Sequence, residues 1–292
     1  MVDRLEALLA HFSVTANVFQ TGALCGISDL SDRGSCGHLH LVRSGEVGVS
    51  HGGAEVLRIT QPSLLLYPQP MAHRFLTDPT RGADFVCAQL AFEGGANNPI
   101  CAALPPFVCV PLAEIGGAQQ VLTLLFEEAF EQRCGRRALL DRLFEVVLIQ
   151  VLRHLMEKGE TRAGMLSGLS HARLRNAIVA MHEGADREWT LDTLAERAGM
   201  SRSVFATQFR DTVGCTPGAY LQRWRVGLAQ QALRQGRSLK LIAGEVGYGS
   251  EAALSRAFKA QCGLSPREWK QAQPSQAIRS PRPAPSPAAA AT

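Results

Sequence analysis

The chain has 292 residues, of which 46% are hydrophobic and 19% are charged, the composition of an ordinary globular protein with room for two domains. Its formal net charge of +4 is unevenly spread, because residues 1–171 hold 13 Lys and Arg against 17 Asp and Glu, whereas residues 172–271 hold 15 against 9. The basic part predicts an acidic partner such as nucleic acid. We see no signal peptide and no membrane-spanning apolar run, so we expect a cytoplasmic protein without a membrane partner.

Short apolar runs broken by glycine and proline occupy residues 18 to about 111, which is typical of small antiparallel strands. Gly45, Gly48, Gly52 and Gly53 are predicted to mark turns. Strands spaced this closely indicate a barrel or a sandwich.

Two histidine motifs lie in this segment. His38-x-His40 is predicted to lie on one strand, and Pro68-x-Pro70-x-x-His73 follows further along, in the sequence PQPMAH. With these motifs the segment resembles the cupin-type sensor domain, which implies a β-barrel over residues 1–112. Pro70 departs from the cupin pattern, since it stands where cupins usually carry a glycine.

The histidines suggest a metal site. Residues two apart on a strand share a face, so Cys36, His38 and His40 would project together. With His73 across the barrel they would offer mixed sulfur and nitrogen ligands, suited to zinc, copper or iron. The alternative is that the histidines are remnants, or hydrogen-bonded groups inside a ligand pocket. Glu46 falls later in the chain than a cupin's ligand glutamate, so the resemblance assigns no glutamate ligand. A transition metal in the barrel is the one cofactor that the sequence suggests.

Two helices are predicted next, over about residues 118–133 and 137–158, ended by Gly135 and Gly159. The second carries more apolar surface than one packing face needs. It packs on the barrel, or it pairs with its counterpart in a second chain, and we favour a homodimer. We assign residues 113–168 to this helical linker and dimerisation region.

The last third contains a helix-turn-helix pattern twice, at an offset of 48 or 49 residues. Two crossing helices need a small side chain at their contact, which suits Ala195 and Ala243, and a residue that accepts positive φ at the bend, which suits Gly199 and Gly247. The other matched positions are Leu191, Phe205, Phe209, Gly214, Pro217 and Tyr220 in the first copy and Leu239, Leu254, Phe258, Gly263, Pro266 and Trp269 in the second.

Helix starts can be identified in both copies. Ser201 and Ser250 stand where an N-cap is wanted, and Thr216-Pro217 marks a further start. Ser265 and Glu268 form a predicted capping box.

Residues 169–272 resemble the DNA-binding domain of AraC/XylS-type transcription regulators, in the phrases WTLDTLAERAGMSRSVFATQF, GCTPGAYLQRWRVGLAQQAL and IAGEVGYGSEAALSRAFKAQCGLSPREW. The resemblance implies a seven-helix domain in which one long helix, over residues 219–234 here, joins two helix-turn-helix units. Such an arrangement would place the two recognition helices about one DNA turn, roughly 34 Å, apart.

The alignment with this family also implies which residues face DNA. Arg256 is the first candidate for a base contact, since a guanidinium binds guanine O6 and N7 together. Arg202, Arg210 and Lys259 are expected to anchor phosphates. The full set of expected DNA-binding residues is Arg202, Ser203, Ala206, Thr207, Arg210, Ser250, Glu251, Ala252, Ser255, Arg256 and Lys259.

Cysteines offer a rival sensing mechanism. The chain has 8 cysteines and no CxxC pair, which favours a reducing compartment without structural disulfides. Some cupin-bearing members of the family that the sequence resembles sense oxidants through cysteines in comparable places, so Cys25 and Cys87 are our redox candidates. Oxidation at Cys25 would then shift the barrel.

The fold class predicted is a multidomain α+β protein: a cupin-like barrel, helices, and an all-α DNA-binding domain. We expect a sequence-specific transcription regulator, not an enzyme, that responds to a small molecule, a metal or an oxidant. Its expected partners are double-stranded promoter DNA, RNA polymerase and a second copy of the chain. The alternative is a metal-dependent cupin enzyme with an accessory nucleic-acid-binding domain. Residues 273–292, rich in Pro, Ala and Ser, are predicted to be disordered.

Overall fold

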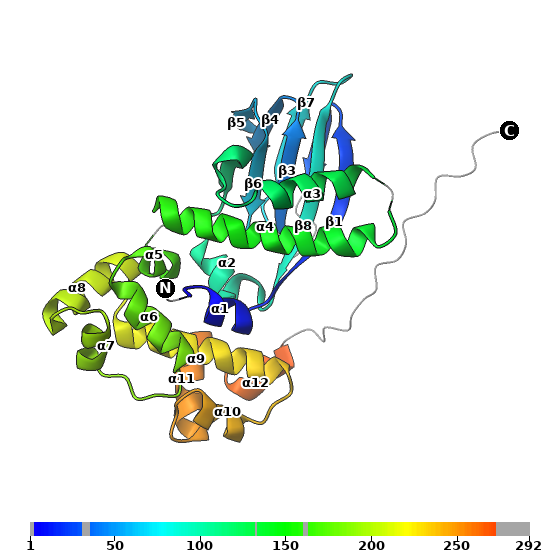
Figure 1. The fold of residues 1–292 in the computed structure, drawn as a ribbon. Helices are drawn as coiled ribbons and strands as arrows, with labels where there is room; N and C mark the ends of the chain where they lie inside the picture. Colours follow the sequence, from blue (N-terminus) through cyan, green and yellow to red (C-terminus); the bar gives the residue numbers. More distant parts are fainter. Residues whose placement is uncertain (1–2, 31–35, 132, 160–162, 273–292) are drawn as a thin grey trace.

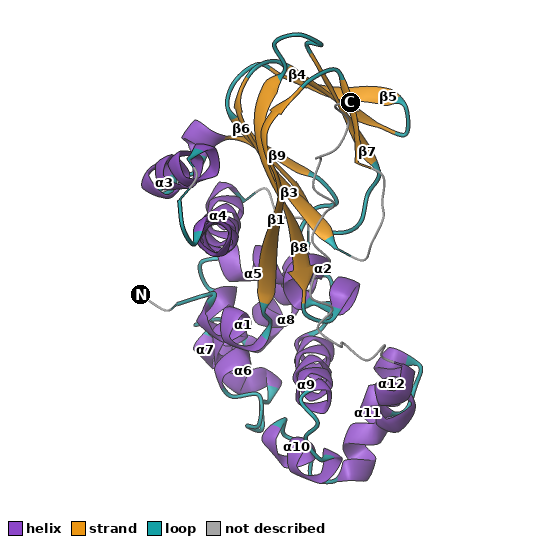
Figure 2. Cartoon of the chain, turned by 90° about the vertical axis from the view of Figure 1, so that its right-hand side faces the viewer, coloured by secondary structure: helices purple, strands orange, loops and turns teal. Residues whose placement is uncertain are grey.

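The computed structural model describes residues 3–30, 36–131, 133–159 and 163–272 (Figure 1). The tail for which disorder is predicted lies outside these described residues. The chain forms an N-terminal β-domain, two helices laid across it, and a helical C-terminal part (Figures 1 and 2). This arrangement confirms the predicted fold class.

The β-domain is built from two facing sheets. One has the strand order β1-β8-β3-β6-β9 and the other β2-β7-β4-β5, with every neighbouring pair antiparallel. The strands are β1 (Val14–Leu24), β2 (Ile27–Leu30), β3 (Gly37–Ser44), β4 (Val47–His51), β5 (Ala54–Ile59), β6 (Ser63–Tyr67), β7 (His73–Thr77), β8 (Ala83–Phe92) and β9 (Val108–Pro111).

Three helices frame the β-domain along the sequence. Helix α1 (Glu6–His11) precedes β1, α2 (Pro99–Ala103) follows β8, and α3 (Gln119–Phe130) follows β9. Short 3-10 turns occupy Gly95–Asn97 and Leu112–Glu114.

Helix α4 (Arg136–Lys158) covers the free edge of the five-stranded sheet. The backbone N–H of Val18 donates to Asp141 at 2.7 Å and that of Ala16 donates to Glu145 at 3.3 Å. These bonds satisfy donors of β1 that no strand pairs, so α4 closes the edge of the sheet. Of the two alternatives from the sequence, packing on the β-domain is therefore present within the chain.

Seven helices follow between residues 174 and 272, the number that the family resemblance implies for the DNA-binding domain. They are α6 (Leu174–Glu183), α7 (Leu191–Arg197), α8 (Arg202–Val213), α9 (Pro217–Arg234), α10 (Leu239–Glu245), α11 (Glu251–Cys262) and α12 (Pro266–Ala272). Helix α5 (Met165–Ser170) links them to α4. The long helix α9 lies at the centre of this part (Figure 2).

The buried apolar residues form three cores. One fills the space between the two sheets, with Phe75 and Phe85 fully buried there. A second runs without a break from the outer side of the five-stranded sheet through α4, α5 and α6 to Trp224 on α9. A third packs α10–α12 on the opposite side of α9, around Phe258. The first helix-turn-helix unit thus shares its core with the β-domain, and the second has a core of its own.

Local details mostly follow the sequence. Gly45, Gly52 and Gly53 take positive φ at turns, but Gly48 lies inside β4, where it pairs with Arg58. Gly48 was therefore wrongly predicted as a turn, because glycine marks a close approach in a strand as readily as a bend. Gly135 is the N-cap of α4 rather than the end of α3, which stops at Phe130.

None of the helices in the described part of the chain combines the length and the apolar character that a membrane span requires.

Candidate DNA-binding surface and sensor site

The first helix-turn-helix unit is formed by α7 and α8. Gly199 has a φ of 60° at the bend, and the backbone N–H of Met200 donates to the carbonyl of Ala195 at 2.9 Å, which closes the turn. Ala195 is buried at the crossing, and Phe205 and Phe209 are fully buried beneath α8. The small residue, the glycine and the two aromatic rings thus hold α8 in place as predicted.

The opposite face of α8 is open to solvent. Arg202, Ser203, Thr207 and Arg210 are exposed and Ala206 is half-buried. Ser201 stands at the N-cap as expected, but its side chain makes no capping hydrogen bond. Its hydroxyl lies 3.5 Å from that of Ser203 instead.

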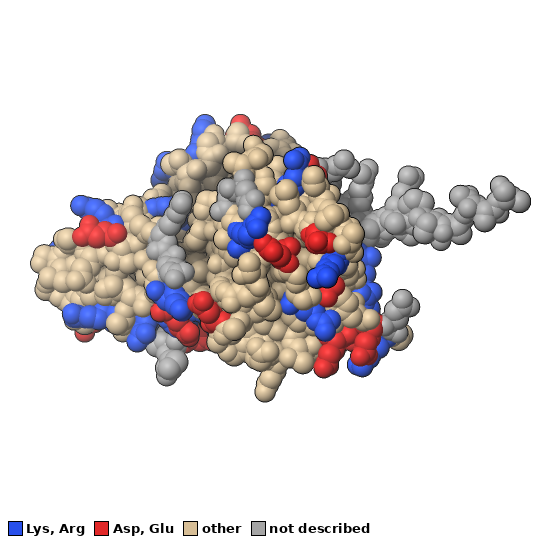
Figure 3. Space-filling model, turned by 90° about the horizontal axis from the view of Figure 1, so that it is seen from above, with Lys and Arg blue, Asp and Glu red and all other residues tan. Residues whose placement is uncertain are grey.

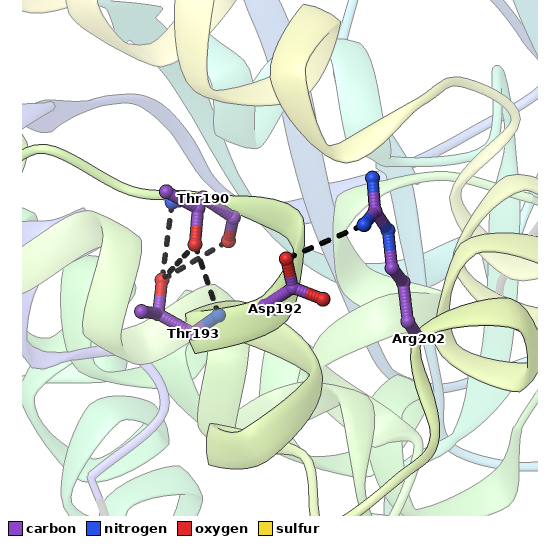
Figure 4. Close-up of polar contacts among 4 residues, drawn as sticks. All are labelled: Thr190, Asp192, Thr193 and Arg202. Atoms are coloured by element: carbon purple, nitrogen blue, oxygen red, sulfur yellow. Dashed lines mark hydrogen bonds and ion pairs between the residues drawn. The ribbon is translucent and has the colours of Figure 1, made fainter.

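A capping box and an ion pair fix the start of this unit (Figure 4). The backbone N–H of Thr193 donates to the Thr190 hydroxyl at 3.1 Å, and that of Thr190 donates to the Thr193 hydroxyl at 3.0 Å. The guanidinium of Arg202 donates to Asp192 at 3.4 Å, and both side chains are about two-thirds exposed, at 65% and 66%. Such an exposed pair is weak, so Arg202 can exchange Asp192 for a phosphate at little cost.

The second unit, α10 and α11, repeats the geometry. Gly247 has a φ of 79°, and the N–H of Tyr248 donates to the carbonyl of Ala243 at 2.7 Å. The hydroxyl of Ser250 accepts from the N–H of Ala253 at 3.2 Å, so this predicted N-cap is formed. On the outer face Ser250, Glu251, Ala252, Arg256 and Lys259 are exposed and Ser255 is half-buried.

Helix α9 joins the units through an arginine that no sequence motif marks. Arg225 donates from Nε to the carbonyl of Ala185 and from Nη2 to the carbonyl of Arg187, both at 2.7 Å. Its guanidinium also lies 5.7 Å from the ring centre of Tyr248. One side chain therefore contacts the segment before α7 and the turn of the second unit. Nothing in the spacing of apolar residues indicates such a contact.

The N-terminal ends of α9 and α12 are capped by side chains. Thr216 caps α9 through a bond from the N–H of Ala219 at 3.3 Å. Ser265 and Glu268 form the predicted capping box of α12, with bonds of 2.8 and 3.3 Å.

Inside the β-domain, the structure brings together three of the four residues expected at a metal site. His38 and His40 lie on β3 and His73 lies on β7 of the facing sheet. One nitrogen from each lies within 4.8 Å of the others, and all three side chains are buried. Cys36 precedes β3 and is not in this group.

Hydrogen bonds indicate the tautomers of His40 and His73. Nδ1 of His73 lies 2.7 Å from the carbonyl of Met71, which can only accept, so Nδ1 carries the proton and Nε2 a lone pair. Nε2 of His40 lies 2.9 Å from Nε2 of His73 and therefore donates to it. Nδ1 of His40 then has no hydrogen-bond partner among the described residues.

The electrostatics keep the rings of His40 and His73 neutral. Burial, and then the proximity of the other two histidines, hold the pKa of His40 well below its usual value. Burial lowers the pKa of His73 to about 4, against the opposing effect of its bond to Met71. The ring of Tyr67 stacks on that of His73 at 4.0 Å.

The donor set fits a transition metal. Two imidazole ligands of a tetrahedral zinc ion stand about 3.3 Å apart for metal–nitrogen distances of about 2.05 Å. A cation replacing the proton shared by His40 and His73 would thus need only small shifts of the two rings. The bond from His73 to Met71 is the outer-shell contact that orients a histidine ligand.

The two redox candidates lie apart. Cys25 is exposed just beyond the end of β1, whereas Cys87 is buried on β8, opposite His40. Gln20 is the partner of Cys87 across β1 and β8, so Cys25 is five residues further along, or about 16 Å at 3.3 Å per residue. The two thiols are too distant for a direct disulfide. Burial raises the pKa of Cys87, so its thiol stays protonated.

Charges on the face of the β-domain seen from above are of both signs and interspersed (Figure 3). This face therefore carries no large patch of one sign.

Comparisons with known proteins agree with the assignment of a cupin domain and of a helix-turn-helix domain. Residues 3–157 match a family model described as Cupin, and residues 194–272 match one described as Helix-turn-helix domain. A putative AraC-like transcription regulator of Streptomyces lividans is 39% identical over 172 residues, which are 57% of this chain and 56% of the relative. The match therefore spans little more than half the length of that relative.

Two further similarities cover different shares of the chain. The RCS-specific HTH-type transcriptional activator RclR of Escherichia coli is 28% identical over 236 residues, 80% of this chain and 83% of that protein. The crystal structure of the DNA-binding domain of AdpA in complex with a target DNA is 33% identical, covers 35% of this chain and 93% of that one, and has a TM-score of 0.32.

Proposed function

The chain belongs to the AraC/XylS family of helix-turn-helix transcription regulators, with a cupin domain at its N-terminus, and on this premise we propose that α8 and α11 bind two successive major grooves of a promoter. The observation that carries the proposal is the pair of equivalent units on one helix. Helix α9 has 18 residues, or about 27 Å at 1.5 Å per residue, and its two sides pack against different units. That length suits readers spaced by one DNA turn.

The exposed faces of α8 and α11 supply the contacts. Arg256 reads a guanine, and Glu251 on the same face can accept a hydrogen bond from a cytosine amino group. Arg202, Arg210 and Lys259 bind phosphates. The remaining expected contacts, Ser203, Ala206, Thr207, Ser250, Ala252 and Ser255, are short, so they permit close approach to bases.

The cupin domain senses an effector in this proposal, and its three histidines hold a metal ion. His38, His40 and His73 would be the protein ligands, with Cys36 or an exogenous group completing the set. The bound metal would supply a Lewis acid and an open coordination position. The rings of His40 and His73 are kept neutral, and only a neutral imidazole can ligate.

The signal reaches the DNA-binding part through the shared core. Phe12, which follows α1, packs against Trp224 of α9 with ring centres 5.1 Å apart. A change in the β-domain would therefore move the first unit and the start of α9 with it, while the second unit, whose separate core lies on the later part of α9, would follow less closely. The result is an altered angle between the two readers.

Assembly and location complete the proposal. Leu139 and Val146, seven residues apart, are exposed on α4, and Leu124 and Phe130 are exposed on α3. Apolar side chains so placed favour a homodimer through these helices. We propose that the cupin domain ends at residue 112, the linker at residue 168 and the DNA-binding domain at residue 272, where the tail begins. We also propose that the protein acts in the cytoplasm, at promoters, together with RNA polymerase.

The test is selection of bound duplexes from a random pool by the full chain, followed by affinity measurement at several salt concentrations. We expect an enriched sequence with two conserved blocks, and an affinity that falls steeply with salt. Enrichment of no sequence would contradict the proposal.

Experiment can distinguish a sensing role of the histidine triad from a catalytic role. The relatives named above are described as transcription regulators, which favours sensing. Consumption of oxygen by the iron-loaded chain would instead favour the alternative, a cupin enzyme with an accessory nucleic-acid-binding domain.

A further inference from the structure

A bulge in β1 determines the direction of one aromatic ring, that of Phe19. Val18 pairs with Ala88 of β8. Gln20 pairs with the adjacent residue of that strand, Cys87, so Phe19 is the extra residue between two consecutive pairs. A bulge turns a side chain away from the direction that regular alternation would give it, and bulges are frequent beside binding sites.

The ring of Phe19 covers two members of the histidine triad. Strand β8 separates β1 from β3, yet the ring centre of Phe19 lies 5.8 Å from that of His38 and 6.3 Å from that of His40. Phe19 is also 42% exposed, although it is large and apolar. Part of the ring therefore contacts the histidines while the rest faces solvent.

The remaining sides of the triad are enclosed by the core. Tyr67 stacks on His73, and the ring centre of Phe75 lies 5.0 Å from that of His40. Both Tyr67 and Phe75 are fully buried. Within the triad His38 has the largest exposure, 9%. The approach from solvent thus lies on the side of His38, where Phe19 is placed.

Helix α4 holds the bulge from the opposite face of the sheet. The N–H of Val18 donates to Asp141 at 2.7 Å, and the guanidinium of Arg136 donates to the hydroxyl of Thr21 at 2.8 Å. These two bonds lie on either side of Phe19 in the sequence, so the backbone that carries the ring is fixed. Access to the triad therefore requires rotation of the Phe19 side chain rather than a shift of β1.

We propose that Phe19 controls access to the histidine triad and restricts the exogenous ligand of its metal ion to small anions. The ligand would arrive past the ring of Phe19, on the side of His38. Imidazole ligands are neutral, so a divalent ion held by three of them keeps its full charge and favours an anion. The choice of ligand rests on the proposed metal binding, whereas the control of access does not.

Access is tested on the metal-free full chain with diethyl pyrocarbonate, which acylates neutral imidazole nitrogens. Phe19→Ala should raise the acylation rate of His38 and His40 about tenfold, because the ring buries more than half of its surface over the site. Phe19→Tyr keeps the ring and should react as the parent does. Ile27→Ala, which removes an exposed apolar side chain of β2, should do the same.

The buried His182 serves as the internal reference in these measurements, which are read by peptide mass spectrometry. Its acylation should stay equally slow in every variant. Equal rates at His38 and His40 in Phe19→Ala and in the parent overturn the control of access. An equal rise at His182 would reveal general unfolding of the variant and would overturn it as well.

Cobalt(II) exchange, followed by visible absorption, separates access from affinity. Removing a cover lowers one barrier for both directions, so Phe19→Ala should speed uptake and chelator-driven release alike, by about tenfold, and leave the dissociation constant unchanged. Faster release with weaker binding would instead assign Phe19 a structural role and overturn the proposal. A chain that binds no cobalt would refute the proposed metal site and the choice of ligand with it, while the acylation rates would still decide access.

Two probes then test the size of the ligand on the cobalt-loaded chain. Azide should bind the parent and Phe19→Ala with similar affinity. Imidazole should bind Phe19→Ala about tenfold more tightly than it binds the parent, because the deleted ring leaves space for another ring. Imidazole binding of equal strength in both proteins overturns the selection by size.

Discussion

The imidazole of His182 lies stacked on the indole of Trp224, with ring centres 3.7 Å apart and an angle of 16° between the planes. Its Nε2 also lies 2.7 Å from the hydroxyl of Tyr220. A histidine from the first helix of the DNA-binding part is thereby sealed against α9, beside His11 of α1. Burial, and then the proximity of His11, lower the pKa of His182 to about 3.

This depressed pKa predicts acid destabilisation. The unfolded chain binds a proton at His182 near the ordinary histidine pKa of 6.5, whereas the folded chain does so only near 3, so the free energy of unfolding falls as the pH drops from 6.5 towards 3. His182→Gln removes this contribution and should flatten the pH dependence. Urea unfolding at pH 7, 6 and 5 measures it, and equal slopes for parent and variant would show that His182 does not contribute.

Arg225→Met should weaken the packing between the two helix-turn-helix units. The variant leaves the carbonyls of Ala185 and Arg187 without a charged donor, which costs about 2 kcal/mol for bonds of this kind. We expect a lower midpoint of denaturation and a loss of specific DNA affinity that exceeds the loss of non-specific affinity. Arg267→Met, an exposed arginine of α12, is the matched control. Parallel losses in both variants would reject the specific role of Arg225.

Arg256→Ala should weaken binding to the selected duplex and relax preference at one base pair. The expected cost is about 1–3 kcal/mol, the worth of a bidentate guanine contact. Arg153→Ala removes an equal charge from α4 and controls for electrostatics. Competition binding against duplexes changed one base pair at a time gives the answer, and an unchanged base preference would remove Arg256 from the reading residues.

Cys25→Ser should abolish any response of DNA binding to hydrogen peroxide while leaving basal affinity intact. Cys25 is exposed, whereas Cys87 is buried, so the oxidant reaches Cys25 first. Cys134→Ser, at another exposed cysteine, should respond as the parent does. If Cys25→Ser still responds to peroxide, sensing by Cys25 is excluded and the metal or ligand site carries the signal.

His73→Gln should abolish binding of one equivalent of zinc or copper. The glutamine keeps a polar side chain but removes the imidazole that His40 faces at 2.9 Å. His11→Gln, an exposed histidine on α1, should bind metal as the parent does. The check is metal content after dialysis, and full occupancy in His73→Gln would reject the triad as the site.

The repeat made the DNA-binding part predictable from sequence, because its requirements are local. Gly199 and Gly247 both take positive φ, and the alternation of β3 places His38 and His40 on one face. A periodic pattern records such neighbours directly. The same reasoning placed Cys36 with the histidines, but the strand begins only at Gly37, so the alternation does not reach it.

Contacts between segments that are distant in the sequence produce no periodic pattern and could not be predicted in this way. Phe12, His182 and Trp224 meet although they are far apart in the sequence, and Arg225 reaches carbonyls about 40 residues away. Main-chain acceptors carry no sequence signal, and aromatic residues at helical spacing indicate only a core. The packing of Phe12 on α9 likewise depends on how the two domains sit together, which no single motif encodes.

The most direct test of the central claim is a hydroxyl-radical footprint of the full chain on its selected duplex. Two readers held by α9 should protect two tracts on one face of the DNA, centred about 10 base pairs apart. Arg256→Ala should weaken one tract and Arg210→Ala the other. Protection of a single tract, or of tracts on opposite faces of the duplex, would contradict the account.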